Sequence, residues 1–449
     1  MGKHNIEKFS VGYQLLKYSS KILHDCLYSK IHVFNLPKIF STPHLFALNH
    51  QNALMDAMAI LYASERPLVF LARSDIFKNP TLAKILYFLK ILPIFRIRDG
   101  FDALKNNDEI FKNTVRVLNH PRGLAILPEG NHEGVKKLRQ LQKGFARIAF
   151  QTMESNENKA FMIIPTGIDY EDYENFGTSL IVNFGEPFDI TEYFNVYKQN
   201  PAQGLTELRE RLSMELKKLT IHIDSDRWYD TILFLTNLNR ELGQRLKKEH
   251  LTVFNKSREI AEVLSKQDDN SLHMIDLETN CNALKERLKQ VNQTSTTLHS
   301  KSELASLLFA FIIRIPWILL SIPGFVFYGW FFLLLRTIVT KKIKDPQFRT
   351  SVRFGGYIFG FLLLILIESL IPLFFFDGYI YPITILATTL SGFIGLKTFP
   401  TIKRILKSIK SSLLHLLGHK NISSAIEIKQ TLIEQIIQIE NRYDNKNEK

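Results

Sequence analysis

Hydrophobic residues in the first half of the chain occur in short runs separated by amphipathic segments. The runs at 45–48, 124–127 and 162–164 are too short for helices and end in polar or turn-forming residues, which is typical of buried strands. The segments 102–118 and 138–153 between them are predicted helices. Strands that alternate with helices predict an α/β domain, in which helices flank a central mixed sheet.

Helical patterns continue beyond this domain. Residues 5–29 have a moderately amphipathic pattern, and we expect this helix to pack on the α/β domain, with a helix resting on a membrane as the alternative. Leucines at three- and four-residue spacing over 203–219 predict the helix that closes the domain. The first domain is therefore placed at residues 1–225, and a helical connector at 226–300.

Long apolar stretches identify residues 301–400 as an α-helical membrane region. Residues 315–335 form an uncharged run of 21 residues, long enough to cross a hydrocarbon core of about 30 Å. The apolar pattern of this first stretch covers 304–335. Two further stretches, 355–376 and 379–396, are expected to form a helical hairpin that lies within the membrane.

The positive charges predict how this region is oriented. Lysines and arginines cluster before and after the hairpin, so both flanks are expected on the cytoplasmic side, with the Asp377-Gly378 turn outside. To keep the first domain on the cytoplasmic face, residues 304–335 must enter the membrane and return, bending near Pro323-Gly324; a single crossing is the alternative. Glu368, inside the hairpin, is expected to pair with a polar neighbour.

The tail at 401–449 is first basic and then amphipathic. Leu432, Ile436 and Ile439 recur at four- and three-residue steps within the predicted helix at 423–443. We expect this helix to dock on the connector or on a second copy of the chain, and the second arrangement would produce a homo-oligomer.

The net charge of the whole chain indicates which kind of molecule the protein binds. A formal net charge of +13 and a pI near 9.4 favour anionic partners. No nucleic-acid-binding motif is present, and long apolar segments lie between the basic clusters, so we predict an integral membrane protein. The two cysteines, Cys26 and Cys281, are far apart and have no metal-ligand spacing, which argues against a disulfide framework.

Candidate chemistry lies at the end of the first short apolar run. Asn49 and His50 follow the run, and Asp56 follows His50 after five intervening residues. A carboxylate near the start of the next helix can fix the imidazole tautomer and raise its basicity, so that the free nitrogen takes a proton from a hydroxyl. The simpler alternative is a structural hydrogen bond.

Three later blocks strengthen the catalytic interpretation. The four blocks in order are the histidine–aspartate motif at 50–56, an arginine block at 93–100, Pro-Glu-Gly at 128–130 and an apolar-proline block at 162–167. Their order and separation resemble the glycerolipid acyltransferase family, which contains the glycerol-3-phosphate and 1-acylglycerol-3-phosphate acyltransferases. The resemblance covers residues 31–223, and Lys143-Gly144 also fits it.

Two features depart from the pattern of this family. Most members have four residues between the histidine and the aspartate, and the five found here resemble a subfamily that includes fungal-type glycerol-3-phosphate acyltransferases. Pro-Glu-Gly is usually followed by Thr-Arg-Ser, whereas Asn131-His132-Glu133 follows it here. This difference removes an expected cation near the acceptor and leaves the acceptor's identity open.

The resemblance implies a role for each residue of the first two blocks. His50 would be the general base, and Asp56 would orient it. Arg96 and Arg98 would bind the phosphate of the acceptor, since arginine offers planar, permanently charged donors. A surface salt bridge to Asp99 is the alternative for Arg98.

The resemblance also implies roles for the remaining residues of the candidate site. Glu129 and Gly130 match the acceptor-binding block, in which the glutamate would accept a hydrogen bond from a glycerol hydroxyl or hold Arg96. Asn49 would orient the catalytic loop. Pro165 would shape the wall of the acyl or thioester site.

The implied reaction moves an acyl group from acyl-CoA or acyl carrier protein to glycerol-3-phosphate or 1-acylglycerol-3-phosphate in phospholipid synthesis. No cofactor is expected, and no metal is assigned, because His132 has no further ligands at useful spacing. The implied partners are the thioester donor, the acceptor and membrane lipids, not nucleic acid. The alternatives are an acyltransferase for another lysolipid and a non-catalytic membrane scaffold on the same fold.

Overall fold

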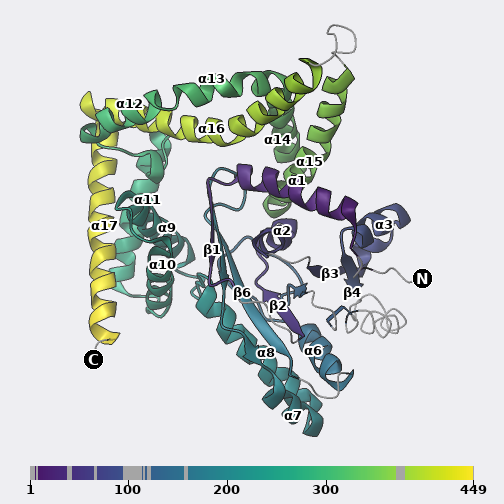
Figure 1. Ribbon diagram of the computed structural model, residues 1–449. Helices are drawn as coiled ribbons and strands as arrows, with labels where there is room; N and C mark the ends of the chain where they lie inside the picture. The colour runs from purple at the N-terminus through teal and green to yellow at the C-terminus, as the bar shows by residue number, and fades with distance from the viewer. Residues whose placement is uncertain are drawn as a thin grey trace.

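The computed structural model describes most of the chain (Figure 1). The described residues are Ile6, Thr114 and the ranges 9–37, 43–64, 68–94, 117–118, 123–155, 160–370 and 380–447. Arg96, Arg98 and most of the predicted helix at 102–118 lie outside them, as does the predicted turn at Asp377-Gly378.

A mixed sheet forms the centre of the first half of the chain. Within the described residues its strands are β1 (Lys30–Phe34), β2 (His44–Leu48), β3 (Val69–Arg73), β4 (Ile91–Ile94), β5 (Leu124–Ile126), β6 (Met162–Tyr170), β7 (Ser179–Phe184) and β8 (Phe188–Asp189). The order is β1-β7-β6-β2-β5-β3-β4, and β8 pairs with β6. Strands β6, β2, β5, β3 and β4 are mutually parallel, so their carboxyl ends meet at one edge; β7 runs antiparallel to β6. The predicted mixed sheet is confirmed.

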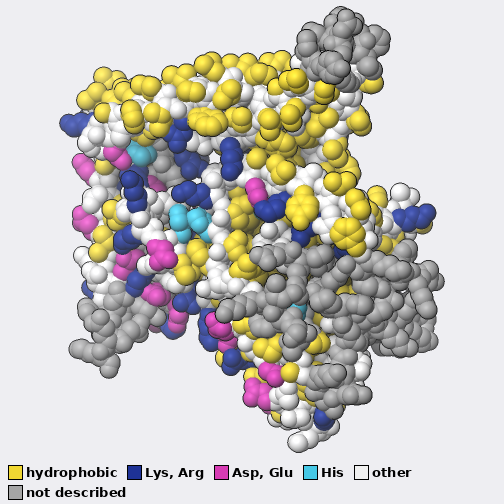
Figure 2. All heavy atoms as spheres, viewed as in Figure 1, with side chains coloured by type: hydrophobic (Ala, Val, Ile, Leu, Met, Phe, Trp, Pro, Cys, Tyr) yellow, Lys and Arg dark blue, Asp and Glu magenta, His cyan; other side chains and the backbone are white. Residues whose placement is uncertain are grey.

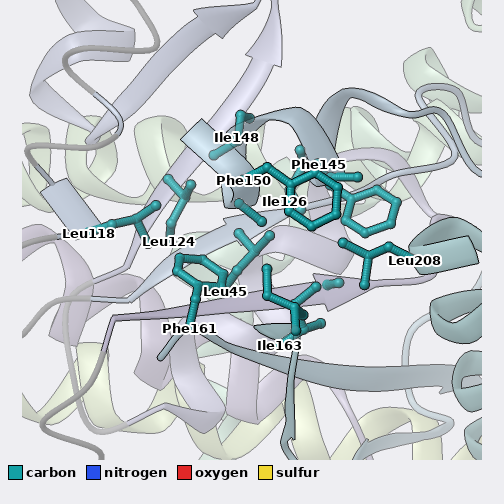
Figure 3. Packing of buried hydrophobic residues seen from close by; sticks show 14 of the residues in the cluster. Leu45, Leu118, Leu124, Ile126, Phe145, Ile148, Phe150, Phe161, Ile163 and Leu208 are labelled. Atoms are coloured by element: carbon teal, nitrogen blue, oxygen red, sulfur yellow. The ribbon is translucent and has the colours of Figure 1, made fainter. Parts of the chain in front are cut away.

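Alternation along β2 divides the core of this domain between the two faces of the sheet. Leu45 and Ala47 belong to one buried cluster, whereas Phe46 and Leu48 belong to another, as the period of two in a strand requires. Figure 3 shows the first cluster, in which side chains of β2, β5 and β6 meet those of α6 (Gly144–Ser155) and α8 (Pro201–Leu219). The opposite face is covered by α1 (Val11–Leu27) and α2 (Ala53–Ala63).

Local signals explain where several helices begin. Ser10 caps α1 by accepting a hydrogen bond from the Tyr13 amide, and Asn200 caps α8 ahead of Pro201. Two further helices of this domain are α3 (Pro80–Phe88) and α7 (Thr191–Gln199). The amino-terminal helix packs on the sheet domain, as the first of the two sequence interpretations expected.

The predicted helix at 138–153 begins later than the sequence suggested, at Gly144. Backbone amides just before it are used elsewhere: Leu138 N donates to His222 Nδ1, Arg139 N to Glu129 Oε2 and Gln142 N to Pro128 O. These tertiary hydrogen bonds replace the helical ones, so the segment stays irregular.

The connector and the tail form a second helical body with its own core. It contains α9 (Tyr229–Arg245), α10 (His250–Ser265), α11 (Leu272–Gln290) and the long α17 (Lys420–Asn447). The predicted docking of the tail helix on the connector is confirmed, since Leu432, Ile436 and Ile439 are buried in this core. A buried ion pair, Lys429 Nζ to Glu241 Oε1 at 2.5 Å, fixes α17 to α9.

Apolar helices form the third part of the structure. They are α12 (Leu304–Ile312), α13 (Ile315–Gly324), a π-helical turn (Phe325–Gly329), α14 (Trp330–Lys342), α15 (Pro346–Leu370) and α16 (Ile380–Leu416). The segments 315–342, 346–370 and 382–416 are each long and apolar enough to cross a membrane. The predicted helical carboxyl-terminal region is confirmed, with long apolar helices that are candidates for membrane spans. Helix α15 begins before the apolar stretch at 355–376, and α16 ends after the one at 379–396.

The outer side of these helices is strongly hydrophobic. In Figure 1, α12 and α13 run beside α16, while α14 and α15 turn toward the sheet domain. Figure 2 shows hydrophobic side chains over the outer side of this layer, with lysines and arginines gathered on the side that faces the rest of the molecule. Basic residues at this boundary suit contact with anionic headgroups.

The bend expected near Pro323-Gly324 coincides with a break in helical hydrogen bonding. Gly324 N donates to Ser391 Oγ at 2.7 Å, and Ser391 Oγ donates to Leu320 O at 2.6 Å. In an uninterrupted helix Gly324 N would donate directly to Leu320 O, but here the serine hydroxyl bridges the two groups. The π-helical turn then begins at Phe325. That residues 304–335 enter the membrane and return stays a prediction, with a single crossing as the alternative.

The polar pairing predicted for Glu368 is confirmed. Its buried carboxyl accepts hydrogen bonds from the hydroxyls of Tyr328 and Thr388, which come from the π-helical turn and from α16. A polar group among apolar helices is satisfied internally, as its surroundings require.

The crossing of α13 and α16 provides a test of this packing. A Cβ atom added to Gly324 would overlap the backbone of Gly392, whereas one added to Gly355 on α15 would meet open space. We expect Gly324→Ala to destabilise the protein by about 1–3 kcal/mol, because two backbones must separate. Gly355→Ala is the matched control. The thermal midpoint of both variants is measured in detergent. Midpoints that fall equally in the two variants, or that fall in neither, would refute the close crossing.

Candidate active site

The histidine–aspartate pair predicted from the sequence is formed. His50 follows the carboxyl end of β2, Asp56 lies in the first turns of α2, and His50 Nδ1 is 2.9 Å from Asp56 Oδ2. The Asp56 side chain is fully buried, while 16% of the His50 side chain is exposed. A carboxylate at Nδ1 favours the tautomer with its proton on that atom, which leaves Nε2 free to accept one.

The backbone of the catalytic loop also converges on the aspartate. Asp56 Oδ2 accepts hydrogen bonds from Gln51 N at 2.7 Å and from Asn52 N at 2.8 Å. A buried carboxylate is costly unless such donors surround it. These interactions all reach the Oδ2 oxygen, and they hold the loop around His50.

One of the five residues between His50 and Asp56 adopts an unusual backbone conformation. Ala53 adopts a φ of 45°, in the left-handed region that residues with a Cβ rarely use. It lies at the first position of α2, directly after Asn52. The longer spacing is thus accommodated by one strained residue at the helix start, and the pair itself still meets.

Glu129 supports the loop from the neighbouring strand. It follows β5, and its two carboxylate oxygens accept hydrogen bonds from His50 N at 2.6 Å and Arg139 N at 3.0 Å. Burial raises the pKa of Glu129 to about 7, although both backbone amides act in the opposite direction. Gly130, the next residue, has a φ of 70° that suits glycine and ends the turn.

Asn49 and Pro165 are buried beside the pair. The Asn49 side chain donates to Ile168 O at 2.9 Å and accepts from Ile168 N at 2.7 Å, so it joins the end of β2 to β6. Pro165 lies within β6 opposite Ala47, and its carbonyl accepts from Gly185 N at 2.8 Å. Both residues fix the strand that presents His50.

The arginine block cannot be placed among these side chains. Arg96 and Arg98 lie outside the described residues, and β4 ends at Ile94, two residues before Arg96. Their assignment to the acceptor phosphate stays a prediction.

His132 lies beside the catalytic histidine. The ring centroids of His50 and His132 are 5.0 Å apart in an edge arrangement, and Phe348 packs on the other side of His132 at 4.6 Å. Burial and then the proximity of His50 lower the pKa of His132. In the part of the chain that the structure describes, no group of three or more histidine, cysteine or acidic residues could hold a metal ion.

A buried ion cluster that the sequence did not reveal lies behind the loop. Lys136 Nζ contacts Asp169 Oδ1 at 2.6 Å, and Arg240 from α9 contacts the other oxygen of Asp169. The Tyr173 ring lies over Lys136, and its hydroxyl donates to Gln51 Oε1 at 2.9 Å. The helical connector thus reaches the catalytic loop through charged side chains that show no local motif.

The start of α15 is the second contribution that sequence reasoning missed. Thr350 Oγ1 donates to Asn52 Oδ1 at 2.8 Å, and Leu54 N donates to Ser351 Oγ at 3.1 Å. Thr350 and Asn52 are 298 positions apart in the sequence, so no spacing could have indicated the contact.

The described geometry places a histidine–aspartate pair at the carboxyl edge of the parallel strands of a mixed sheet. The Acyltransferase family model matches residues 30–169, which include His50, Asp56 and Glu129. This part of the chain is an acyltransferase domain. The resemblance inferred from the four sequence blocks is confirmed.

Two similar proteins of Saccharomyces cerevisiae are glycerol-3-phosphate O-acyltransferases. Glycerol-3-phosphate O-acyltransferase 2 is 23% identical over 265 residues, covering 56% of this chain and 35% of the relative. Glycerol-3-phosphate O-acyltransferase 1 is 24% identical over 134 residues, covering 29% of this chain and 17% of that protein. The chain therefore spans about a third or less of the length of these relatives.

A solved structure also resembles part of the chain. The 1-acyl-sn-glycerophosphate acyltransferase of Thermotoga maritima is 18% identical, with a TM-score of 0.33, over 46% of this chain and 79% of that one.

Ala53 allows the strain in the loop to be tested. Glycine adopts a positive φ without steric cost, so we expect Ala53→Gly to leave the unfolding free energy unchanged or slightly higher. Ala57→Gly, in the ordinary interior of α2, should instead lower it by about 1 kcal/mol. Thermal unfolding of both variants in detergent compares the two positions. Equal losses would show that residue 53 is not strained.

Glu129 predicts a pH dependence of stability. The pKa of Glu129 in the folded protein, about 7, exceeds its ordinary value of 4.5, so the folded state binds more protons between these values. The contribution of Glu129 to stability is therefore present at low pH and is lost as the pH rises from about 4.5 through 7.

The neutral variant Glu129→Gln isolates this effect, because its side chain does not titrate. The thermal midpoint of the unmodified protein, relative to the variant, should fall between pH 5 and pH 8. A difference that is constant over this range would contradict the raised pKa of the buried carboxyl.

Proposed function

We propose that this chain is a membrane-bound O-acyltransferase that moves an acyl group from a thioester to a hydroxyl of glycerol-3-phosphate or 1-acylglycerol-3-phosphate in phospholipid synthesis. The observation that carries the proposal is the hydrogen bond between His50, which follows β2, and Asp56 of α2, within the matched acyltransferase domain. The yeast relatives named above favour glycerol-3-phosphate as the acceptor.

His50 acts as the general base in this proposal. Its Nε2 removes the hydroxyl proton of the acceptor as the hydroxyl oxygen attacks the thioester carbonyl. The new C–O bond forms, the C–S bond breaks, and the proton passes from the imidazolium to the departing thiolate. Asp56 keeps the proton on Nδ1 and stabilises the imidazolium during this step.

The surroundings of the two cysteines favour direct transfer of the acyl group to the acceptor over an intermediate in which the acyl group is bound to a cysteine. Burial raises the pKa of the Cys281 thiol to about 12, and it also raises the pKa of Cys26. Cys281 lies within the hydrophobic core of the connector rather than near His50. Neither thiol is therefore assigned as a nucleophile.

The acceptor phosphate is assigned to Arg96 with Arg98 beside it. Strand β4 runs parallel to β3 and ends at Ile94, and β3 in turn pairs with β5, the strand that precedes Glu129. Two guanidinium groups from this block would bind the acceptor phosphate strongly, because both are permanently charged and offer planar donors. The donor is acyl-CoA or acyl carrier protein, and no cofactor takes part.

The apolar helices support a membrane location. Exposed hydrophobic side chains come from each of them, as in Phe309, Leu319, Val326, Phe359 and Ile383. We assign the catalytic domain to the cytoplasmic face, where acyl thioesters are available, with residues 301–400 holding it against the lipid. The acyltransferase domain at 1–225, the connector at 226–300 and the tail at 401–449 remain on that side.

The activity can be measured with membranes that contain the protein. They are incubated with a labelled acyl thioester, as acyl-CoA or acyl carrier protein, and with glycerol-3-phosphate or 1-acylglycerol-3-phosphate in separate reactions. We expect His50→Ala and Asp56→Asn each to lower kcat by about 100- to 10,000-fold. His273→Ala, an exposed histidine on α11, is the control and should keep full activity.

The outcomes separate the alternatives. Product from one acceptor chooses the substrate. Product that persists in His50→Ala would refute the mechanism. If no product forms with either acceptor and either donor, the proposed substrates are wrong. The protein would then be an acyltransferase for another lysolipid or a non-catalytic membrane scaffold.

A further inference from the structure

The amino-terminal turn of α15 makes two hydrogen bonds to the loop that carries His50 and Asp56. Thr350 Oγ1 donates to Asn52 Oδ1 at 2.8 Å, and Ser351 Oγ accepts from Leu54 N at 3.1 Å. Thr350, Ser351 and Asn52 are all buried, so water does not readily replace these contacts. The same helix continues through 346–370 as a candidate membrane span.

Ser351 supplies a helix cap that α2 does not supply for itself, and Thr350 holds the side chain at the cap position. Asn52 occupies the N-cap position of α2, but its side chain makes no cap hydrogen bond to the helix. Its side-chain oxygen accepts from Thr350, and the Leu54 amide near the start of α2 is satisfied by Ser351. A capping residue normally comes from the chain just before the helix; here it comes from another element.

The residues held in this way belong to the arrangement around Asp56. The backbone amide of Asn52 donates to Asp56 Oδ2 at 2.8 Å, and the same oxygen is 2.9 Å from His50 Nδ1. A contact path therefore runs from Thr350 through Asn52 and Asp56 to His50. Each step is a hydrogen bond between buried or partly buried groups.

A second contact path reaches His50 from the same turn of α15. Phe348 packs on the His132 ring, which in turn lies at 5.0 Å from the His50 ring. Arg349 Nη1 pairs with Glu174 Oε2 at 2.8 Å, and Arg353 donates to the backbone carbonyl of Glu174. Glu174 follows Tyr173, whose carbonyl accepts from the Asn52 side chain at 3.3 Å. The turn is thus fastened on both sides of the catalytic loop.

We infer that Thr350 and Ser351 are positioning residues, which make the geometry of the His50–Asp56 loop depend on the seating of the membrane helix α15. This inference rests on the proposed function only in that it treats His50 as the base. A loop that lost these contacts would keep its substrate-binding groups but would present the base in more than one orientation.

The test uses the full chain in detergent or lipid nanodiscs, with two readouts. Ser351→Ala and Thr350→Val remove the hydroxyls, while Ser351→Thr and Thr350→Ser retain them. Thr340→Val is the control, because the Thr340 hydroxyl bonds only Arg336 O within its own helix α14. The first readout is amide hydrogen exchange over 50–56, and the second is the division of any activity change between kcat and KM.

We expect Ser351→Ala to raise the exchange rate of the Leu54 amide by about fivefold, the usual effect of losing a helix cap. The two hydroxyl-removing variants should lower kcat by about 5- to 100-fold with little change in KM. The hydroxyl-retaining variants and Thr340→Val should behave as the unmodified protein does in both readouts.

Unchanged exchange over 50–56 in Ser351→Ala and Thr350→Val would overturn the inference, whatever the activity. Raised exchange with an unchanged kcat would also overturn it, because the contacts would then stabilise the loop without positioning the base. An unmodified protein that is inactive with every acceptor would refute the proposed function alone, since the exchange readout still decides whether α15 holds the loop.

Discussion

The buried carboxylate of Asp56 is the constraint on which the site depends. Taking an ionised carboxyl out of water costs several kcal/mol unless donors surround it. Here one oxygen receives the His50 ring and the amides of Gln51 and Asn52, so the loop must curl around a single point. Ala53 takes a left-handed conformation where the curled loop enters α2. The Asn52 side chain bonds Thr350 and the Tyr173 carbonyl instead of capping the helix, and Ser351 accepts from the Leu54 amide in its place.

A related constraint shapes the apolar helices. Where water is excluded, every backbone polar group needs a partner within the protein. Pro323 interrupts α13, and Ser391 from α16 satisfies both the amide and the carbonyl that the interruption leaves. Gly324 and Gly392 allow the close approach that brings this serine into place. The bend and the helix crossing are therefore one feature, which neither helix could form alone.

The sequence predicted features that depend on local patterns. Short apolar runs identified strands of a mixed sheet, and the spacing of His50 and Asp56 identified the pair, because a strand followed directly by a helix brings these positions together. The late start of α6 was missed, since the amides of Leu138 and Arg139 bond to distant residues. Lys136, Thr350 and Ser351 were missed for the same reason. Their importance comes from neighbours far away along the chain, which a single sequence does not indicate.

The contacts of α15 also bear on how the protein can be divided for laboratory work. Cutting the chain at residue 225 would preserve every sequence block of the acyltransferase, yet it would remove Thr350 and Ser351. It would also remove Phe354 and Tyr357, which are buried in the cluster that contains residues of α1 and α2. A water-soluble fragment of this kind would retain the catalytic side chains but lose the partners that arrange them. A useful minimal protein must therefore include the apolar helix α15, so a version that is handled without detergent calls for redesign of the exposed apolar face of α15 rather than its deletion.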